Sequence, residues 1–123
     1  MASPPSDFRF TTEARGGYIF VWQGGLALTI EDIKPMQAAI EEALAAHNTT
    51  LVMFDNRETI APDQTLRAEM WTWLSSCDAL HRVALLQDSV RHQKRANTTA
   101  ERNRVAVQAF TGVPDAEAWL LQS

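Results

Sequence analysis

The sequence contains very little cysteine. Cys77 is the single cysteine among 123 residues, so a disulfide within the chain and a metal site built from several thiolates are both excluded. No histidine or basic side chain stands beside Cys77 in the sequence to activate its thiol. We therefore expect a small, partly buried residue near the end of a helix, not a nucleophile.

Long apolar segments are also missing. The longest apolar runs are too short to cross a bilayer, and the opening MASPPS has neither the basic start nor the apolar centre of a signal peptide. Apolar residues make up 46% and charged residues 21% of the chain, as is ordinary for a folded domain. We expect a disordered leader over residues 1–6, a single domain over residues 7–123, and a cytoplasmic protein without stable membrane insertion.

The motifs that would identify an enzyme are absent as well. The chain contains no GxGxxG, no P-loop and no GxSxG. The three histidines, His47, His81 and His92, fall on different expected elements, whereas a metal site needs several converging ligands. We expect a structural or surface role for each histidine, no metal, no cofactor and no catalysis.

The charge is unevenly distributed. The net charge is −4, with 12 acidic and 6 basic residues up to Asp88 and 3 acidic and 5 basic residues after it. An acidic chain with one modest basic segment, Arg91 to Arg104, is poorly suited to nucleic-acid binding, because phosphate neutralisation dominates that affinity. The segment is either the solvated face of a helix or a surface that meets an acidic partner or an anion.

Apolar periodicity indicates five strands and four helices. Strands are expected at 7–13, 18–24, 49–55, 81–88 and 104–110, and helices at 29–48, 62–77, 89–103 and 112–123. Gly16 and Gly17 suit a turn between the first two strands, and Pro35 is expected in the first turn of the first helix. The alternation predicts an α/β fold with a mixed, mainly parallel sheet of about five strands and helices packed against it.

Two carboxylates bracket the loop after the third expected strand. Asp55 ends the strand and Asp63 precedes the next helix. Ligands of open α/β sheets bind beyond the carboxyl ends of strands, which makes Asp55 and Asp63 candidate site residues. The plainer interpretation is that Asp63 caps the helix and Asp55 satisfies loop backbone groups. Alternatively, the loop from Asp55 to Thr65 is a recognition surface on a rigid scaffold; catalysis by the two carboxylates is the weakest of the three.

Several stretches together resemble a known family. TTLVMFDN as a central strand, the spacing of Asp55 and Asp63, HRVALLQD after the next helix, and the closing VQAFTGVPDAEAWL are similar to the STAS domain, especially its stand-alone bacterial, SpoIIAA-like branch. The resemblance covers roughly Tyr18 to Leu121. It implies a SpoIIAA-like fold and a non-enzymatic, regulatory role like that of an anti-sigma factor antagonist.

One position departs from the pattern of that family. In the antagonists the second Asp is followed by a phosphorylatable Ser, then a small residue and Gly, whereas this chain has Gln64, then Thr65, and no Gly. The family's phosphate adds roughly −2 charge at a helix N-terminus, and Gln cannot carry one. The departure implies that the usual switch is absent, with Thr65 as a displaced alternative acceptor.

The resemblance leads to two functional predictions. The first is a non-enzymatic regulatory or protein-binding module. The second follows from a similarity to lipid-binding proteins of the Sec14 type and implies a carrier of a small apolar ligand, although tryptophans at this spacing are more often plain core. A homodimer is a further prediction, because surplus tryptophans on an exposed helix face invite a symmetric partner. The predicted partner-binding residues are Asp55, Asn56, Arg57, Asp63, Gln64 and Thr65. The predicted pocket residues are Trp22, Met70, Trp71 and Trp73.

Overall fold

The computed structural model describes residues 10–23, 30–57, 64–101 and 105–122. A five-stranded sheet runs in the order β1 (Phe10–Arg15), β2 (Tyr18–Gln23), β3 (Leu51–Asp55), β4 (Arg82–Leu86) and β5 (Ala106–Phe110). β1 pairs antiparallel with β2, and every later pair is parallel. The predicted mixed, mainly parallel sheet is confirmed.

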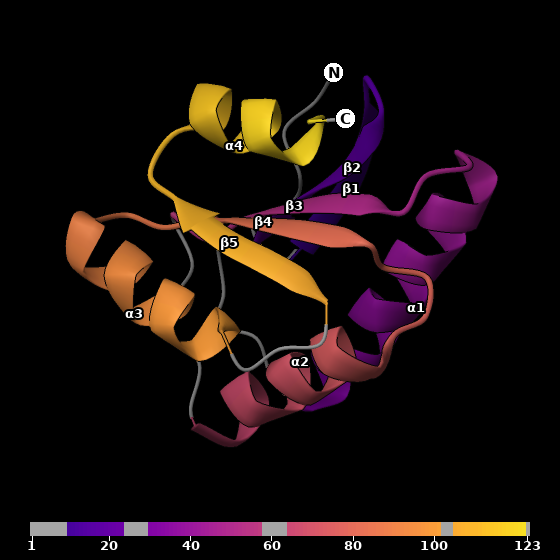
Figure 1. The fold of residues 1–123 in the computed structure, drawn as a ribbon. Coiled ribbons are helices and arrows are strands. Elements are labelled where there is room, and N and C mark those ends of the chain that lie inside the picture. The colour runs from indigo at the N-terminus through magenta and orange to yellow at the C-terminus, as the bar shows by residue number, and fades with distance from the viewer. Residues whose placement is uncertain (1–9, 24–29, 58–63, 102–104, 123) are drawn as a thin grey trace.

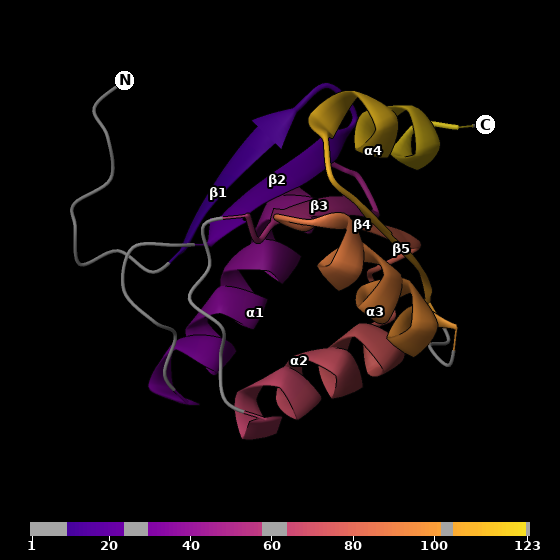
Figure 2. The same cartoon turned by 90° about the vertical axis from the view of Figure 1, so that its left-hand side faces the viewer.

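Helices cover both faces of this sheet (Figure 1, Figure 2). On one face lie α1 (Ile30–Ala46), α2 (Gln64–Ser76) and α3 (Val90–Ala100), and on the other lies α4 (Val113–Leu120). Each of the first three helices joins a strand to its parallel neighbour, and right-handed crossovers place all three on the same side. The expected leader at residues 1–6 lies outside the described residues.

The central strands are apolar throughout because both of their faces are covered. In β3, Val52 and Phe54 pack into the core beneath α1 and α2, while Met53 points to the opposite face and packs with residues of α4. Successive side chains of a strand alternate between the two faces, so a continuous apolar run serves two cores.

Hydrogen bonds from polar side chains also hold α4 against the sheet. The buried Tyr18 donates a hydrogen bond from its hydroxyl to Glu117 Oε2 at 2.8 Å. Burial, together with this acidic partner, raises the pKa of Tyr18. Arg82 donates from Nη1 to the carbonyl oxygens of Trp119 and Leu120, at 3.3 and 3.4 Å, and so satisfies the end of the helix.

Three details differ from or complete the sequence prediction. β1 continues to Arg15, two residues beyond its expected end. Pro35 lies inside α1 and not in its first turn, so the prediction was wrong and one intrahelical hydrogen bond is lost there. The most polar helical pattern does form a helix, α3, because Ser89 caps it by accepting the N–H of His92 at 3.2 Å.

The parallel strands bring three chain segments to one edge of the sheet. The strands β2, β3 and β4 end at Gln23, Asp55 and Leu86, and a backbone hydrogen bond of 3.0 Å from Asn56 to the Leu86 carbonyl extends the pairing beyond them. Gln87 likewise donates its N–H to the carbonyl of Phe110 at 2.8 Å. Polar residues of separate strands therefore stand side by side at the carboxyl edge.

Candidate functional site

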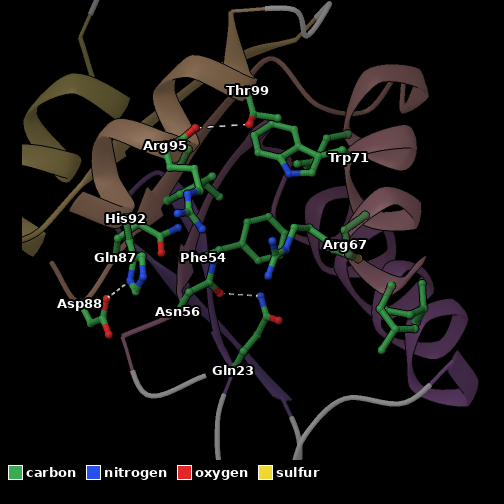
Figure 3. Close-up of a pocket in the computed structure, with 16 residues that line it drawn as sticks. Gln23, Phe54, Asn56, Arg67, Trp71, Gln87, Asp88, His92, Arg95 and Thr99 are labelled. Carbon is green, nitrogen blue, oxygen red and sulfur yellow. Dashed lines mark hydrogen bonds and ion pairs between the residues drawn. The ribbon is translucent and has the colours of Figure 1, made fainter. Parts of the chain in front are cut away.

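A cavity of about 440 Å³ lies at this carboxyl edge, between the sheet and the helices α2 and α3 (Figure 3). This volume falls in the range of roughly 300–1,000 Å³ that is typical of small-molecule sites. Its wall is largely apolar, because it continues the core beneath the three helices. The apolar lining residues on the sheet, α1 and α2 are Ile33, Phe54, Leu66, Met70, Leu74 and Leu85.

Two amides close the cavity on the strand side. Gln23 Nε2 donates to Asn56 Oδ1 at 2.8 Å, which joins the ends of β2 and β3. Gln23 is only 6% exposed, so its side chain is a buried polar group held by hydrogen bonding. This pairing fixes the position of Asn56 relative to the cavity that both residues line.

Two arginines reach the cavity from opposite helices. Arg67 comes from α2 and Arg95 from α3, and in Figure 3 both side chains extend from their helices toward the space between them. Trp71, one turn after Arg67, presents its half-buried ring to the same space. The cavity therefore combines an apolar floor, an aromatic wall and two cationic groups at its mouth.

The mouth also carries an acidic residue that is already paired. His92 Nδ1 lies 2.5 Å from Asp88 Oδ1, one helical turn apart at the start of α3, and both side chains are about half exposed. The hydrogen bond from His92 lowers the pKa of Asp88 below its usual value. The carboxylate of Asp88 is therefore directed toward His92.

Asp55 forms an ion pair with Arg57 and is not among the residues that line this cavity. Arg57 donates from Nε to Asp55 Oδ1 at 2.9 Å and from Nη2 to Oδ2 at 3.0 Å, and its backbone N–H reaches Oδ1 at 3.1 Å. Burial alone would raise the pKa of Asp55, but these hydrogen bonds outweigh it and hold the pKa below its usual range. Asp55 thus remains an ion that shapes the start of the following loop.

The predicted partner-binding residues are only partly described. Asp55, Asn56 and Arg57 lie together at the end of β3, and Thr65 is exposed in the first turn of α2. Gln64 is the first residue of α2, and its side chain lies outside the described part of the chain, as does the whole of Asp63. Whether Asp63 caps the helix therefore stays a prediction, and so does the binding role of the six residues.

The predicted pocket residues separate into three places. Met70 and Trp71 line the cavity. Trp73, on the other side of α2, packs on the core and borders a second, more open hollow beside α1. Trp22 packs with the α4-side core, on the opposite face of the sheet, so it does not line the cavity. All four rings or chains are partly buried, and their part in ligand binding stays a prediction.

Sequence reasoning missed the contribution of α3. The basic stretch after Asp88 had two open interpretations, yet its lining residues recur at helical spacing: Asp88, His92, Arg95, Ala96 and Thr99. The expectation for His92 also overlooked Asp88, the carboxylate four residues before it. The spacing of four, three, one and three residues was a visible signal for one face of a helix.

The remaining candidate groups lie elsewhere. Cys77 is buried, and its Sγ lies 3.5 Å from Glu41 Oε1. Burial is the main cause that raises the pKa of the thiol, and the acidic neighbour raises it further. Within residues 10–23, 30–57, 64–101 and 105–122, no group of three or more His, Cys, Asp or Glu side chains is placed to hold a metal ion. None of the described helices is long and apolar enough to span a membrane.

Comparison with known proteins identifies the fold. The chain is similar in structure to an uncharacterized protein of the DUF3478 family, with a SpoIIAA-like fold, from Shewanella loihica PV-4; the TM-score is 0.70, the identity 21%, and the match covers 98% of each chain. The fold of this chain is therefore SpoIIAA-like, as the sequence resemblance predicted. No protein-family model and no curated protein matches the sequence.

Proposed function

We propose that this protein is a non-enzymatic binding module that holds a small molecule in the cavity at the carboxyl edge of its sheet. The observation that carries the proposal is the cavity itself, about 440 Å³ in size and floored by apolar core residues. Small-molecule sites are typically concave and mostly apolar, with a few polar groups that fix orientation. Gln23, Asn56 and the two arginines are such groups here.

The titratable groups support binding in preference to catalysis. A catalytic site brings perturbed acids, bases or nucleophiles together around the substrate. Here Asp55 is neutralised by Arg57 outside the cavity, Cys77 borders the other hollow, and Asp88 pairs with an exposed histidine. The cytoplasmic location stays a prediction, and a cysteine that forms no disulfide is compatible with it.

Binding of a protein partner in a regulatory role is the second candidate function, and the ion pair between Asp55 and Arg57 favours it. The ion pair fixes the position of Arg57, two residues after the end of β3, and the Arg57 side chain is still 39% exposed. A fixed, partly exposed side chain just beyond a strand end suits recognition. The homodimer stays a separate prediction; its argument from an exposed aromatic face is weakened, because Trp71 and Trp73 are half buried on α2.

The cavity proposal is tested by filling the space. Ala96 of α3 lines the cavity, whereas Ala118 of α4 is exposed on the opposite side of the sheet. We expect Ala96→Phe to abolish the fluorescence gain of the neutral apolar probe phenylnaphthylamine, while Ala118→Phe leaves it unchanged. Circular dichroism establishes that both variants fold. Equal probe binding by the wild type and a folded Ala96→Phe variant would contradict the proposal.

A further inference from the structure

We propose that the cavity selects an amphipathic anion: a molecule with an apolar or aromatic body and one acidic head group bound between Arg67 and Arg95. This inference rests on the proposed function and names the chemical class of its ligand. The body would occupy the space over Phe54 and beside Trp71, and the head group would lie at the mouth (Figure 3).

The first support is the state of the two arginines. Within the described part of the chain, neither guanidinium has an ion pair or a hydrogen bond to a side chain or carbonyl. Three other described arginines are engaged: Arg15 with Glu13, Arg57 with Asp55, and Arg82 with carbonyl oxygens of α4. Arg67 and Arg95 thus retain donor groups whose planar fork matches a carboxylate or a phosphate.

The second support is the local charge. The described Asp, Glu, Lys and Arg residues that line the cavity are Arg67, Arg95 and Asp88, so two positive charges stand against one negative charge. The chain as a whole carries a net charge of −4, so the cavity differs in sign from the rest of the protein. Since Asp88 is paired with His92, the field at the mouth favours an anion over a cation.

The third support is the arrangement of polar and apolar surface. The arginines come from two helices that flank the cavity, and the apolar floor lies below them on the sheet and α2. A bare inorganic anion would leave this floor in contact with water, and a neutral hydrocarbon would leave the arginines without a partner. An amphipathic anion satisfies both surfaces, because apolar burial and charge-assisted hydrogen bonds act on different parts of one molecule.

The test uses a pair of fluorescent probes that differ by one charged group. Anilinonaphthalene sulfonate is the sulfonate of phenylnaphthylamine, so the two share one aromatic body. We expect the wild type to bind the sulfonate roughly tenfold or more tightly than the neutral probe, since a charge-assisted pair with two arginines is formed only by the former.

The variants locate the preference. The double variant Arg67→Met, Arg95→Met should lose that tenfold preference and keep its affinity for the neutral probe. The matched control is Arg91→Met, Lys94→Met, which removes the same charge from exposed positions of α3 that do not line the cavity. The control should retain the preference, which separates binding at the mouth from a general effect of charge.

Competition experiments identify the class of acidic head group and show whether binding requires the apolar part of the ligand. Decanoate, decyl phosphate or both should displace the sulfonate probe from the wild type, whereas acetate and inorganic phosphate should not. Displacement by the bare anions at equal concentrations would overturn the amphipathic assignment. Displacement by decanoate alone, or by decyl phosphate alone, supports it and names the preferred head group.

Two further outcomes overturn the inference in distinguishable ways. Equal binding of the two probes, or a preference that persists in the folded Arg67→Met, Arg95→Met variant, refutes the anion selectivity and leaves a functioning apolar cavity. Binding of neither probe refutes both the inference and the proposed function.

Discussion

At the scale of single residues, Asp55 is the one charged residue that is buried within the described part of the chain. Its side chain is 10% exposed, and its carboxylate accepts two hydrogen bonds from the Arg57 side chain. Arg57→Met would leave a buried carboxylate with one backbone donor, and we expect a loss of about 1–3 kcal/mol in the free energy of unfolding at neutral pH. Denaturant titration measures this loss.

The pH dependence of that loss gives a second, independent check. The pKa of Asp55 is lowered in the folded state, so its ion stabilises the fold above the unfolded pKa of about 4, and this stability is lost as the pH falls through the folded pKa. The difference between wild type and Arg57→Met should therefore shrink below about pH 4. A difference that stays constant from neutral to acid pH would show that Arg57 acts through packing alone.

The exposed pair of Glu13 and Arg15 provides the contrast. These side chains are 50% and 36% exposed, with a closest distance of 3.2 Å. Glu13→Gln should change the free energy of unfolding by less than about 0.5 kcal/mol, because exposed ion pairs are screened by water. The comparison separates the effect of burial from the effect of charge.

At the scale of elements, the hairpin between β1 and β2 depends on Gly17. Its φ is +97°, a region in which an L side chain is strained, and an added Cβ would lie 3.0 Å from Leu121 Cδ2. Gly17→Ala should destabilise the fold by about 1–2 kcal/mol, mainly through the backbone, since the end of the Leu121 side chain is able to move. Thermal unfolding followed by circular dichroism measures the change.

Gly16 is the matched control in the same turn. A Cβ at Gly16 meets no atom within 4 Å, and its φ lies outside the left-handed region. Gly16→Ala should therefore alter the free energy of unfolding by no more than about 0.5 kcal/mol. Equal losses for the two substitutions would mean that the turn tolerates no side chain for a reason other than the φ of Gly17.

The helices and strands were predictable because their sequence patterns are local. Which face of each element borders the cavity was not predictable. Apolar runs identify β3 and β4, and the capped stretch after Ser89 forms α3. Trp22 alternates with Val21, so the sequence places these residues on opposite faces of β2, but which face carries a cavity depends on where α4 packs. That packing is a property of the assembled sheet.

The candidate site was predictable in part for the same reason. Asn56 follows a strand end and lies at the cavity, as binding beyond carboxyl ends leads one to expect. Arg95 belongs to a helix whose polar sequence suits solvent equally well. Its position opposite Arg67 results from two crossovers on one face, which no short motif encodes.

At the scale of the whole molecule, we expect the proposed ligand to affect one side of the sheet and not the other. Binding should slow amide hydrogen exchange in α2 and α3, which flank the cavity. A ligand that binds the native state disfavours the local unfolding that allows exchange. α4 covers the opposite face of the sheet and should exchange at an unchanged rate.

Exchange measured by mass spectrometry with saturating anilinonaphthalene sulfonate checks this pattern. The Ala96→Phe variant, in which the cavity is filled, should show no slowing in either helix. Protection centred on α4 in the wild type would place the probe on the wrong face of the sheet.

The most direct measurement is native mass spectrometry of the protein purified gently from its own source. We expect a mass above that of the bare chain by a few hundred daltons, retained in Ala118→Phe and absent in Ala96→Phe. The mass difference also identifies the class of ligand, and a doubled mass would establish the homodimer. A wild-type protein that carries only the mass of its bare chain or bare dimer would contradict the claim that the cavity holds a small molecule.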